Sequence, residues 1–130
     1  MPEHLWYLAL VSLLTAFLWV PYGLDLILGQ GLGAALGNRH DLRPLSPWAE
    51  RAKRAHENAV QNLVVFAVVV LAAHAAGAAN ATTATAAAVY FWARLAHYGV
   101  YVAGVPGLRT AVWTVAWLCE VVVAWQVLSA

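Results

Sequence analysis

Four long apolar stretches, separated by short polar or glycine-rich connections, constrain this chain more than any other feature of its sequence. They cover about residues 5–28, 47–76, 82–103 and 108–128. Roughly 20 helical residues cross a bilayer core about 30 Å thick, so each stretch is long enough to span a membrane. With 63% hydrophobic and only 10% charged residues, the chain lacks the polar surface of a soluble domain. The sequence predicts an all-α membrane protein, one four-helix transmembrane bundle over residues 1–130.

Local signals indicate where these helices begin and end. Pro21 interrupts the first stretch near its end, and GQGLGAALGNRHDLRPLSP, residues 29–47, is rich in glycine and proline and predicts a loop. Ser46 and Pro47 then suit the N-cap and the first position of the second helix. Glu3 stands where a signal peptide has a basic region, so the first helix is expected to be retained in the membrane.

The basic residues predict the orientation of the bundle. They gather in or just after the first connection and beside the third, whereas the second connection and both ends of the chain have none. Because basic loops stay in the cytoplasm, we expect the first and third connections to be cytoplasmic and both termini to face outward. The residues concerned are Arg39, Arg43, Arg51, Lys53, Arg54 and Arg109.

Charge and cysteine content argue against several classes of partner. A net charge of +1 gives no basic stripe for nucleic acid. Cys119 is the single cysteine, which excludes an intramolecular disulfide and a cysteine-based zinc site. The histidines are scattered, and no pair has ligand spacing on one helix face, so no metal site is expected.

A narrow polar stripe enters the membrane on the second helix. At 100° per residue, Arg51, Arg54, Asn58 and Gln61 fall within an arc of about 80°. Long basic side chains near a helix end can simply extend to lipid headgroups, and this is the alternative for Arg51 and Lys53. Short amides cannot, so Asn58 and Gln61 either hydrogen-bond between helices or line a polar pocket.

A second stripe lies on the third helix, in YFWARLAHYGVY, residues 90–101. Arg94, His97, Tyr98 and Tyr101 follow i, i+3, i+4, i+7 spacing and therefore share one face. An arginine this deep in a span is costly and needs a partner, which makes it a candidate functional residue. Together the two stripes suit an anionic, peptide-like ligand. Simple core packing remains the alternative for His97 and for Tyr98.

Two carboxylates also have alternative interpretations. Glu120, within the fourth helix, is either a buried partner of Arg94 or a protonated acid facing a neighbouring helix. Asp25, near the inner end of the first helix, is expected to pair with Arg39 or Arg43.

These motifs resemble those of the MAPEG family, the membrane-associated proteins of eicosanoid and glutathione metabolism. Arg-Ala-x-x-Asn-x-x-Gln, at Arg54, Ala55, Asn58 and Gln61, is similar to the family's second-helix signature. WARLAHYGVY, followed by Arg109, is similar to its third-helix signature and the arginine after it. The resemblance covers about residues 47–130 and suggests a bacterial member like the microsomal glutathione transferases, in the inner membrane with its site on the cytoplasmic side.

The resemblance implies a homotrimer with glutathione, as co-substrate and without a metal, between neighbouring subunits. Arg109 matches the arginine credited with stabilising the glutathione thiolate, which would attack a lipophilic electrophile or a lipid peroxide. The remaining glutathione-binding positions would be Arg54, Asn58, Gln61, Arg94, His97, Tyr98 and Tyr101.

The sequence departs from the family pattern at Gln61, where the family usually has a glutamate. Glutamine accepts a hydrogen bond but brings no charge. Three functions are therefore distinguished: a glutathione-dependent transferase or peroxidase, a non-catalytic protein that binds a lipid headgroup or another small anion, and a regulatory subunit of a larger complex.

Overall fold

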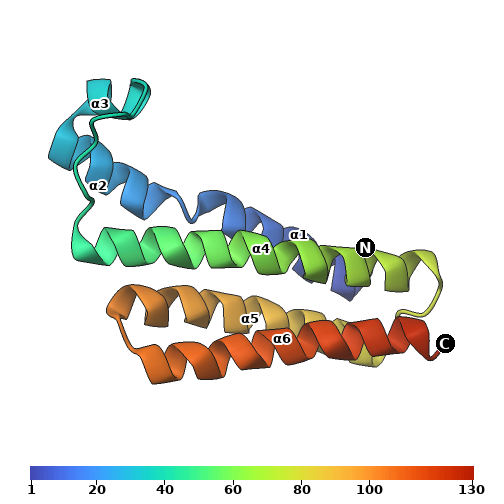
Figure 1. Ribbon diagram of the computed structural model, residues 1–130. Helices are drawn as coiled ribbons and strands as arrows, with labels where there is room; N and C mark the ends of the chain where they lie inside the picture. The colour runs from blue at the N-terminus through green and yellow to red at the C-terminus, as the bar shows by residue number, and fades with distance from the viewer.

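The computed structural model describes all 130 residues, and every regular element is a helix, which confirms the all-α prediction. The elements are α1 (Glu3–Phe17), α2 (Val20–Gln30), α3 (Leu32–Leu36), α4 (Pro47–Ala75), α5 (Ala81–Ala103) and α6 (Pro106–Leu128). Figure 1 shows α1 with α2, α4, α5 and α6 running side by side, with both termini at one end of the bundle and α3 at the other.

Three of these helical segments are long and apolar enough to cross a membrane: Glu3–Gln30, Pro47–Ala75 and Pro106–Leu128. The helix α5 has 23 residues, as many as α6, and packs against α4 and α6, but it is not among the three. The prediction of four spans therefore stays a prediction, whereas three helical segments have the length and composition of a span.

The first apolar stretch contains a helix break that lies earlier in the chain than the sequence predicted. The helix ends at Phe17 and resumes at Val20, rather than running on to be interrupted at Pro21. Pro21 has no N–H to donate to the carbonyl of Phe17, one helical turn earlier, and its ring crowds that carbonyl. The proline thus breaks the helix in the turn that precedes it.

The predicted loop after the first stretch is partly helical. The helix α2 extends to Gln30, and the short α3 forms from Leu32 to Leu36 before the chain becomes irregular. Gly31, at φ +89°, separates the two helices. Leucine and alanine are good helix formers, which favours a helical turn between Gly31 and Gly37. Ala35 in this turn is buried.

The start of α4 corrects the expectation for Asp25. Asp25 pairs with neither arginine; its carboxylate accepts hydrogen bonds from Ser46 N (2.9 Å) and Ser46 Oγ (2.7 Å). Ser46 does occupy the N-cap position, but its hydroxyl is turned to Asp25 instead of capping the helix. This contact joins the middle of α2 to the beginning of α4.

The core of the bundle lies between α1, α4, α5 and α6. Its centre is the stacked pair of Phe66 and Tyr90, with ring centroids 3.7 Å apart, and both rings are fully buried. Small side chains such as Ala73 and Ala87 let the helices approach closely around this pair. The core thereby fixes the relative register of α4 and α5, which carry the two polar stripes.

Candidate functional site

A polar cavity of about 290 Å³ lies at the end of the bundle away from the termini, where α4, α5 and α6 meet. Four of the predicted site residues line it. They are joined by two residues from the first turns of α6. The full lining is Asn58, His97, Tyr101, Arg109, Thr110 and Trp113.

The tight turn between α5 and α6 brings two of these side chains together. Gly104, at φ +79°, ends α5 in the left-handed conformation, and Pro106 begins α6 two residues later. As a result the Arg109 guanidinium lies over the Tyr101 ring, with Cζ 4.6 Å from the centroid. The His97 and Tyr101 rings pack edge to face, with centroids 5.5 Å apart and planes at 71°. A cation is therefore held at the cavity by an aromatic face.

Arg94 is buried, and its partner comes from the other stripe. Its Nη2 donates to Asn58 Oδ1 at 2.9 Å, while Nε and Nη1 have no hydrogen-bond partner in the chain. The backbone carbonyl of Asn58 also accepts a hydrogen bond from Asn62 Nδ2, at 2.8 Å. The two predicted stripes thus meet directly.

Glu120 is buried near this region but forms no hydrogen bond to Arg94, and its Oε1 is unpaired. Glu120 is therefore not a direct hydrogen-bond partner of Arg94, and its role as a buried charge partner of that arginine stays a prediction. The alternative, a protonated acid facing a neighbouring helix, stays a prediction.

Two other residues of the α4 stripe, Arg54 and Gln61, do not line the cavity. Arg54 and Gln61 are exposed on either side of the half-buried Asn58. Arg51, by contrast, is half-buried and donates from Nε to the carbonyl of Val102 at 2.9 Å, which ties the start of α4 to the end of α5. Within one chain, only Asn58 of the proposed second-helix motif reaches the cavity.

Tyr98 lies on another side of α5. Its hydroxyl donates to the carbonyl of Leu18 at 3.1 Å, in the break between α1 and α2. This bond satisfies a carbonyl that the break leaves without a helical partner. In the single chain, Tyr98 therefore has the packing role that was its alternative interpretation.

Trp113 is a lining residue that the sequence analysis did not select. It follows Arg109 by four residues, a spacing that places both on one helix face. Trp113 stacks on the exposed Trp117 with centroids 6.4 Å apart and planes 9° apart. An aromatic surface therefore runs along α6 away from the cavity.

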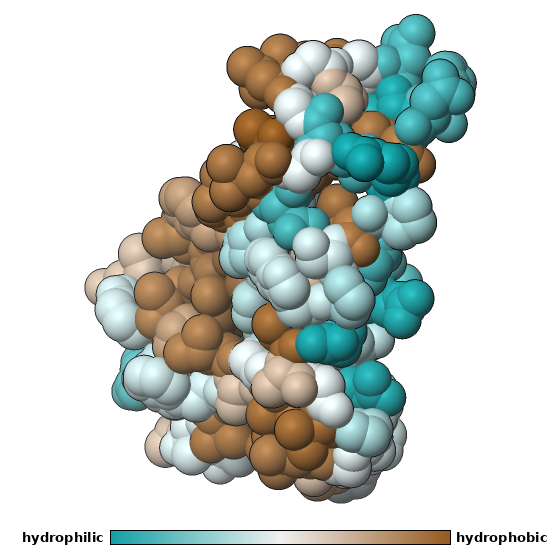
Figure 2. All heavy atoms as spheres, turned by 90° about the vertical axis from the view of Figure 1, so that its left-hand side faces the viewer, coloured by the Kyte–Doolittle hydropathy of each residue, from teal (hydrophilic) through white to brown (hydrophobic).

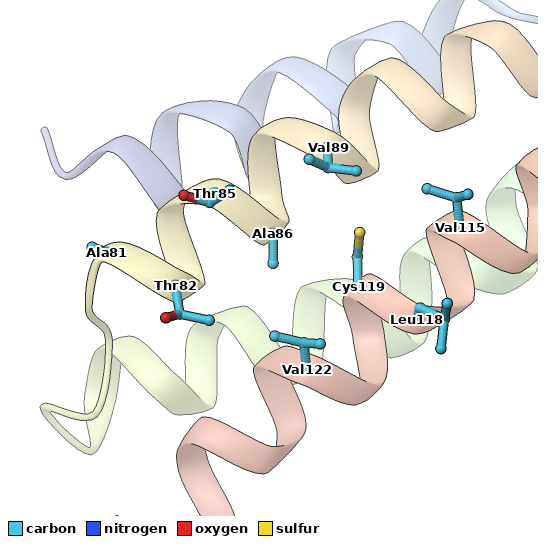
Figure 3. A pocket seen from close by; sticks show the side chains of 9 residues that line it. All are labelled: Ala81, Thr82, Thr85, Ala86, Val89, Val115, Leu118, Cys119 and Val122. Atoms are coloured by element: carbon cyan, nitrogen blue, oxygen red, sulfur yellow. The ribbon is translucent and has the colours of Figure 1, made fainter.

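A second hollow, of about 490 Å³, lies between α5 and α6 (Figure 3) and is almost wholly apolar. The Cys119 thiol points into it, toward α5. At 100° per residue, its lining positions on α6, such as Leu118 and Val122, are on the side opposite Arg109 and Trp113. This groove is therefore not a continuation of the polar cavity.

Two histidines far apart in the sequence meet near the end of the bundle where the termini lie. His4 Nε2 and His74 Nδ1 are 3.2 Å apart, a contact across 70 residues that no local spacing could indicate. The structure contains no group of three or more His, Cys, Asp or Glu side chains able to hold a metal ion.

Comparison with known protein families gives one result for nearly the whole chain. The family model described as the MAPEG family matches residues 4–129. No curated protein matches the chain.

Proposed function

The chain belongs to the MAPEG family, and from this premise we propose that it is a membrane-embedded, glutathione-dependent transferase or peroxidase. Its substrates would be lipophilic electrophiles or lipid peroxides. The observation that carries the proposal is the cavity in which Arg109 lies over Tyr101, beside Asn58 and His97. It combines a positioned cation with amide and aromatic groups at one end of an apolar bundle.

The residues present fit the chemistry of glutathione. The tripeptide carries two carboxylates, an ammonium group, two peptide links and a thiol. Arg54, Arg94 and Arg109 offer guanidinium groups to anionic oxygens, and Asn58 offers an amide to a peptide group. Arg94 has two buried N–H-bearing nitrogens without a partner, a costly arrangement that acceptor oxygens of a ligand would relieve.

Arg109 is the residue we assign to thiolate stabilisation. A thiol with an ordinary pKa of 8.5 is only about 3% ionised at pH 7. A guanidinium held close to the sulfur favours the anion, which is the nucleophile. The Tyr101 ring limits the positions that Arg109 can take, and Thr110 adds a hydroxyl beside it.

We further propose that the active form is a homotrimer, with glutathione between neighbouring subunits. Arg54 and Gln61 are exposed on a single chain, although Gln61 lies in the apolar part of α4. Polar side chains at such depth need a polar partner rather than lipid. A neighbouring subunit with ligand between the two would provide one.

The aromatic surface of α6 suggests how a lipophilic substrate approaches. Trp113 lines the cavity, and Trp117 extends the stack along the helix. An apolar electrophile dissolved in the bilayer can pack against these rings and present its reactive carbon to the sulfur near Arg109.

The thiolate is the quantity to measure. Purified protein in detergent is mixed with glutathione at pH 7, and the ultraviolet absorbance of the thiolate is followed. Arg109→Ala is expected to reduce the signal to that of free glutathione, whereas Cys119→Ala is expected to retain it. The second variant removes the single cysteine of the chain, so any remaining signal comes from glutathione.

The thiolate measurement has two distinct outcomes. A thiolate signal that depends on Arg109 supports the proposal, and a conjugation assay with lipophilic electrophiles then defines the substrate. A full signal in Arg109→Ala, in protein of unchanged oligomeric size, would remove Arg109 from the proposed role.

Gln61 favours a second candidate function, a non-catalytic protein that uses the same cavity for a lipid headgroup or another small anion. The missing carboxylate leaves the ammonium of glutathione without an ionic partner, while the arginines remain suited to any anion. Retention on immobilised glutathione, in competition with anionic lipid, distinguishes the two functions.

A further inference from the structure

A larger cavity lies beside α2, outside the polar site. It has a volume of about 820 Å³, within the range of small-molecule sites. The helix α2 forms one wall, and α3, the irregular segment that follows it and the first turns of α4 form the others. The lining residues are Trp19, Tyr22, Gly23, Leu26, Ile27, Leu32, Ala35, Leu36, Arg39, Leu42, Arg43, Pro44, Leu45, Glu50 and Lys53.

Apolar side chains make up most of the wall. Trp19, Leu32 and Leu36 are 50%, 57% and 78% exposed, so large hydrocarbon surfaces border this cavity without a partner in the chain. Figure 2 views this end of the molecule, with hydrophobic residues along one edge and hydrophilic residues along the other. The apolar wall is suited to hydrocarbon of another molecule.

The polar part of the cavity is cationic. Arg39, Arg43 and Lys53 line it together with one carboxylate, that of Glu50. Glu50 Oε1 accepts a hydrogen bond from the backbone N–H of Leu45 at 3.2 Å, and this single carboxylate cannot balance three cations. An excess of positive charge therefore remains at the cavity.

Backbone carbonyls, not acids, hold the two arginines in place. Arg39 Nε donates to the carbonyl of Ala35 at 2.9 Å, and Arg43 Nη2 donates to that of Gly29 at 3.0 Å. Each guanidinium has five N–H donors, so most of them remain for a ligand. Arg39 also has a φ of +62°, a conformation that is uncommon for a non-glycine residue and often marks a functional position.

We propose that this cavity binds one anionic phospholipid, with an acyl chain against the apolar wall and the phosphate on Arg39, Arg43 and Lys53. Guanidinium groups match phosphate oxygens in paired hydrogen bonds, and basic pockets between membrane helices suit anionic headgroups. The site shares no lining residue with the Arg109 cavity, so it does not depend on the proposed glutathione chemistry.

The test compares phosphatidylglycerol with phosphatidylcholine of identical acyl chains. Delipidated protein is mixed with each lipid in detergent, and the bound lipid is counted by native mass spectrometry. Phosphatidylglycerol is expected to bind at one high-affinity site. The double variant Arg39→Gln/Arg43→Gln is expected to bind phosphatidylglycerol about tenfold more weakly, because charge-assisted contacts are lost. Arg39→Lys/Arg43→Lys keeps the charges and is the matched control, expected to retain most of the binding.

Lys53→Gln covers the case in which the double arginine variant does not fold, because Lys53 is exposed and its loss leaves the loop contacts intact. It is expected to weaken phosphatidylglycerol selectively. Equal binding of the two lipids, or undiminished binding in folded charge-removing variants, would overturn the proposal. Tighter binding of oleate than of phosphatidylglycerol would assign the cavity to a fatty acid and overturn the phospholipid.

Discussion

Arg94 Nη2 donates a 2.9 Å hydrogen bond to Asn58 Oδ1, and this is the one hydrogen bond the buried guanidinium makes within the chain. The bond joins α5 to α4 at the edge of the polar cavity. Asn58 therefore both lines the cavity and stabilises the charge behind it.

Asn58→Ala tests this double role. Removal of the amide leaves a buried cation without a protein partner, so we expect a loss of about 2–3 kcal/mol in the free energy of unfolding. Unfolding by titration with sodium dodecyl sulfate measures it. Asn58→Asp keeps an acceptor for Arg94 and is expected to be much closer to the wild type. Equal losses in the two variants would show that the hydrogen bond from Arg94 is not the source of the stability, because aspartate keeps both the shape of the side chain and the acceptor oxygen.

Tyr101→Leu is expected to weaken thiolate formation by freeing Arg109 from the aromatic face. A cation–π contact contributes about 0.5–2 kcal/mol, which corresponds to a twofold to thirtyfold fall in the proportion of bound thiolate. The ultraviolet thiolate signal at saturating glutathione measures this fall. Tyr101→Phe retains the ring and is expected to keep most of the signal. A loss as large in Tyr101→Phe would assign the effect to the hydroxyl.

Tyr98→Phe is expected to lower stability through loss of the hydrogen bond to Leu18 O. A neutral hydrogen bond contributes about 1 kcal/mol, and the unpaired carbonyl in the helix break adds to the cost. The melting temperature in detergent should therefore fall more for Tyr98→Phe than for Tyr101→Phe. The reverse order would contradict the assignment of Tyr98 to helix packing through its bond to Leu18.

Asp25→Ala is expected to loosen the junction between α2 and α4. The carboxylate accepts two hydrogen bonds from Ser46, and charged acceptors are the stronger kind, so we expect a loss of about 2–3 kcal/mol. Asp25→Asn retains one acceptor oxygen and should lose less. Exposure of the Arg43–Ser46 segment to proteolysis in Asp25→Ala provides an independent measurement. Unchanged stability in both variants would indicate that water replaces the carboxylate.

Sequence periodicity predicted the helices well because each is a local pattern. The helix α4 begins at Pro47 and α5 ends at Ala103, the residues at which the sequence placed these boundaries. The spacing of Arg94, His97, Tyr98 and Tyr101 predicted one shared face. His97 and Tyr101 do line the cavity and Arg94 contacts Asn58 at its edge, whereas Tyr98 contacts Leu18 instead. The MAPEG resemblance is confirmed by the match over residues 4–129.

Contacts between distant segments were out of reach of the same reasoning. The bonds of Tyr98 to Leu18 and of His4 to His74 join positions 80 and 70 residues apart, and they depend on how the helices pack rather than on any local spacing. Asp25 was assigned to an arginine by charge alone, whereas the orphan N–H at the start of α4 competes for the same carboxylate. The choice of partner was therefore not predictable from the spacing of residues along each helix.

Gln61→Glu is expected to tighten glutathione binding. In the proposed trimer this side chain faces the ligand, and a carboxylate would form an ionic hydrogen bond to the ammonium group that a neutral amide cannot match. We expect the dissociation constant to fall about tenfold, as measured by titration calorimetry at pH 7 and low salt. Gln61→Met has a similar length without a polar end and should weaken binding. Tighter binding in Gln61→Glu that high salt abolishes would place the ammonium at this position, because screening acts on the charge and not on the shape. No change in either variant would place the ammonium elsewhere and remove Gln61 from the glutathione site.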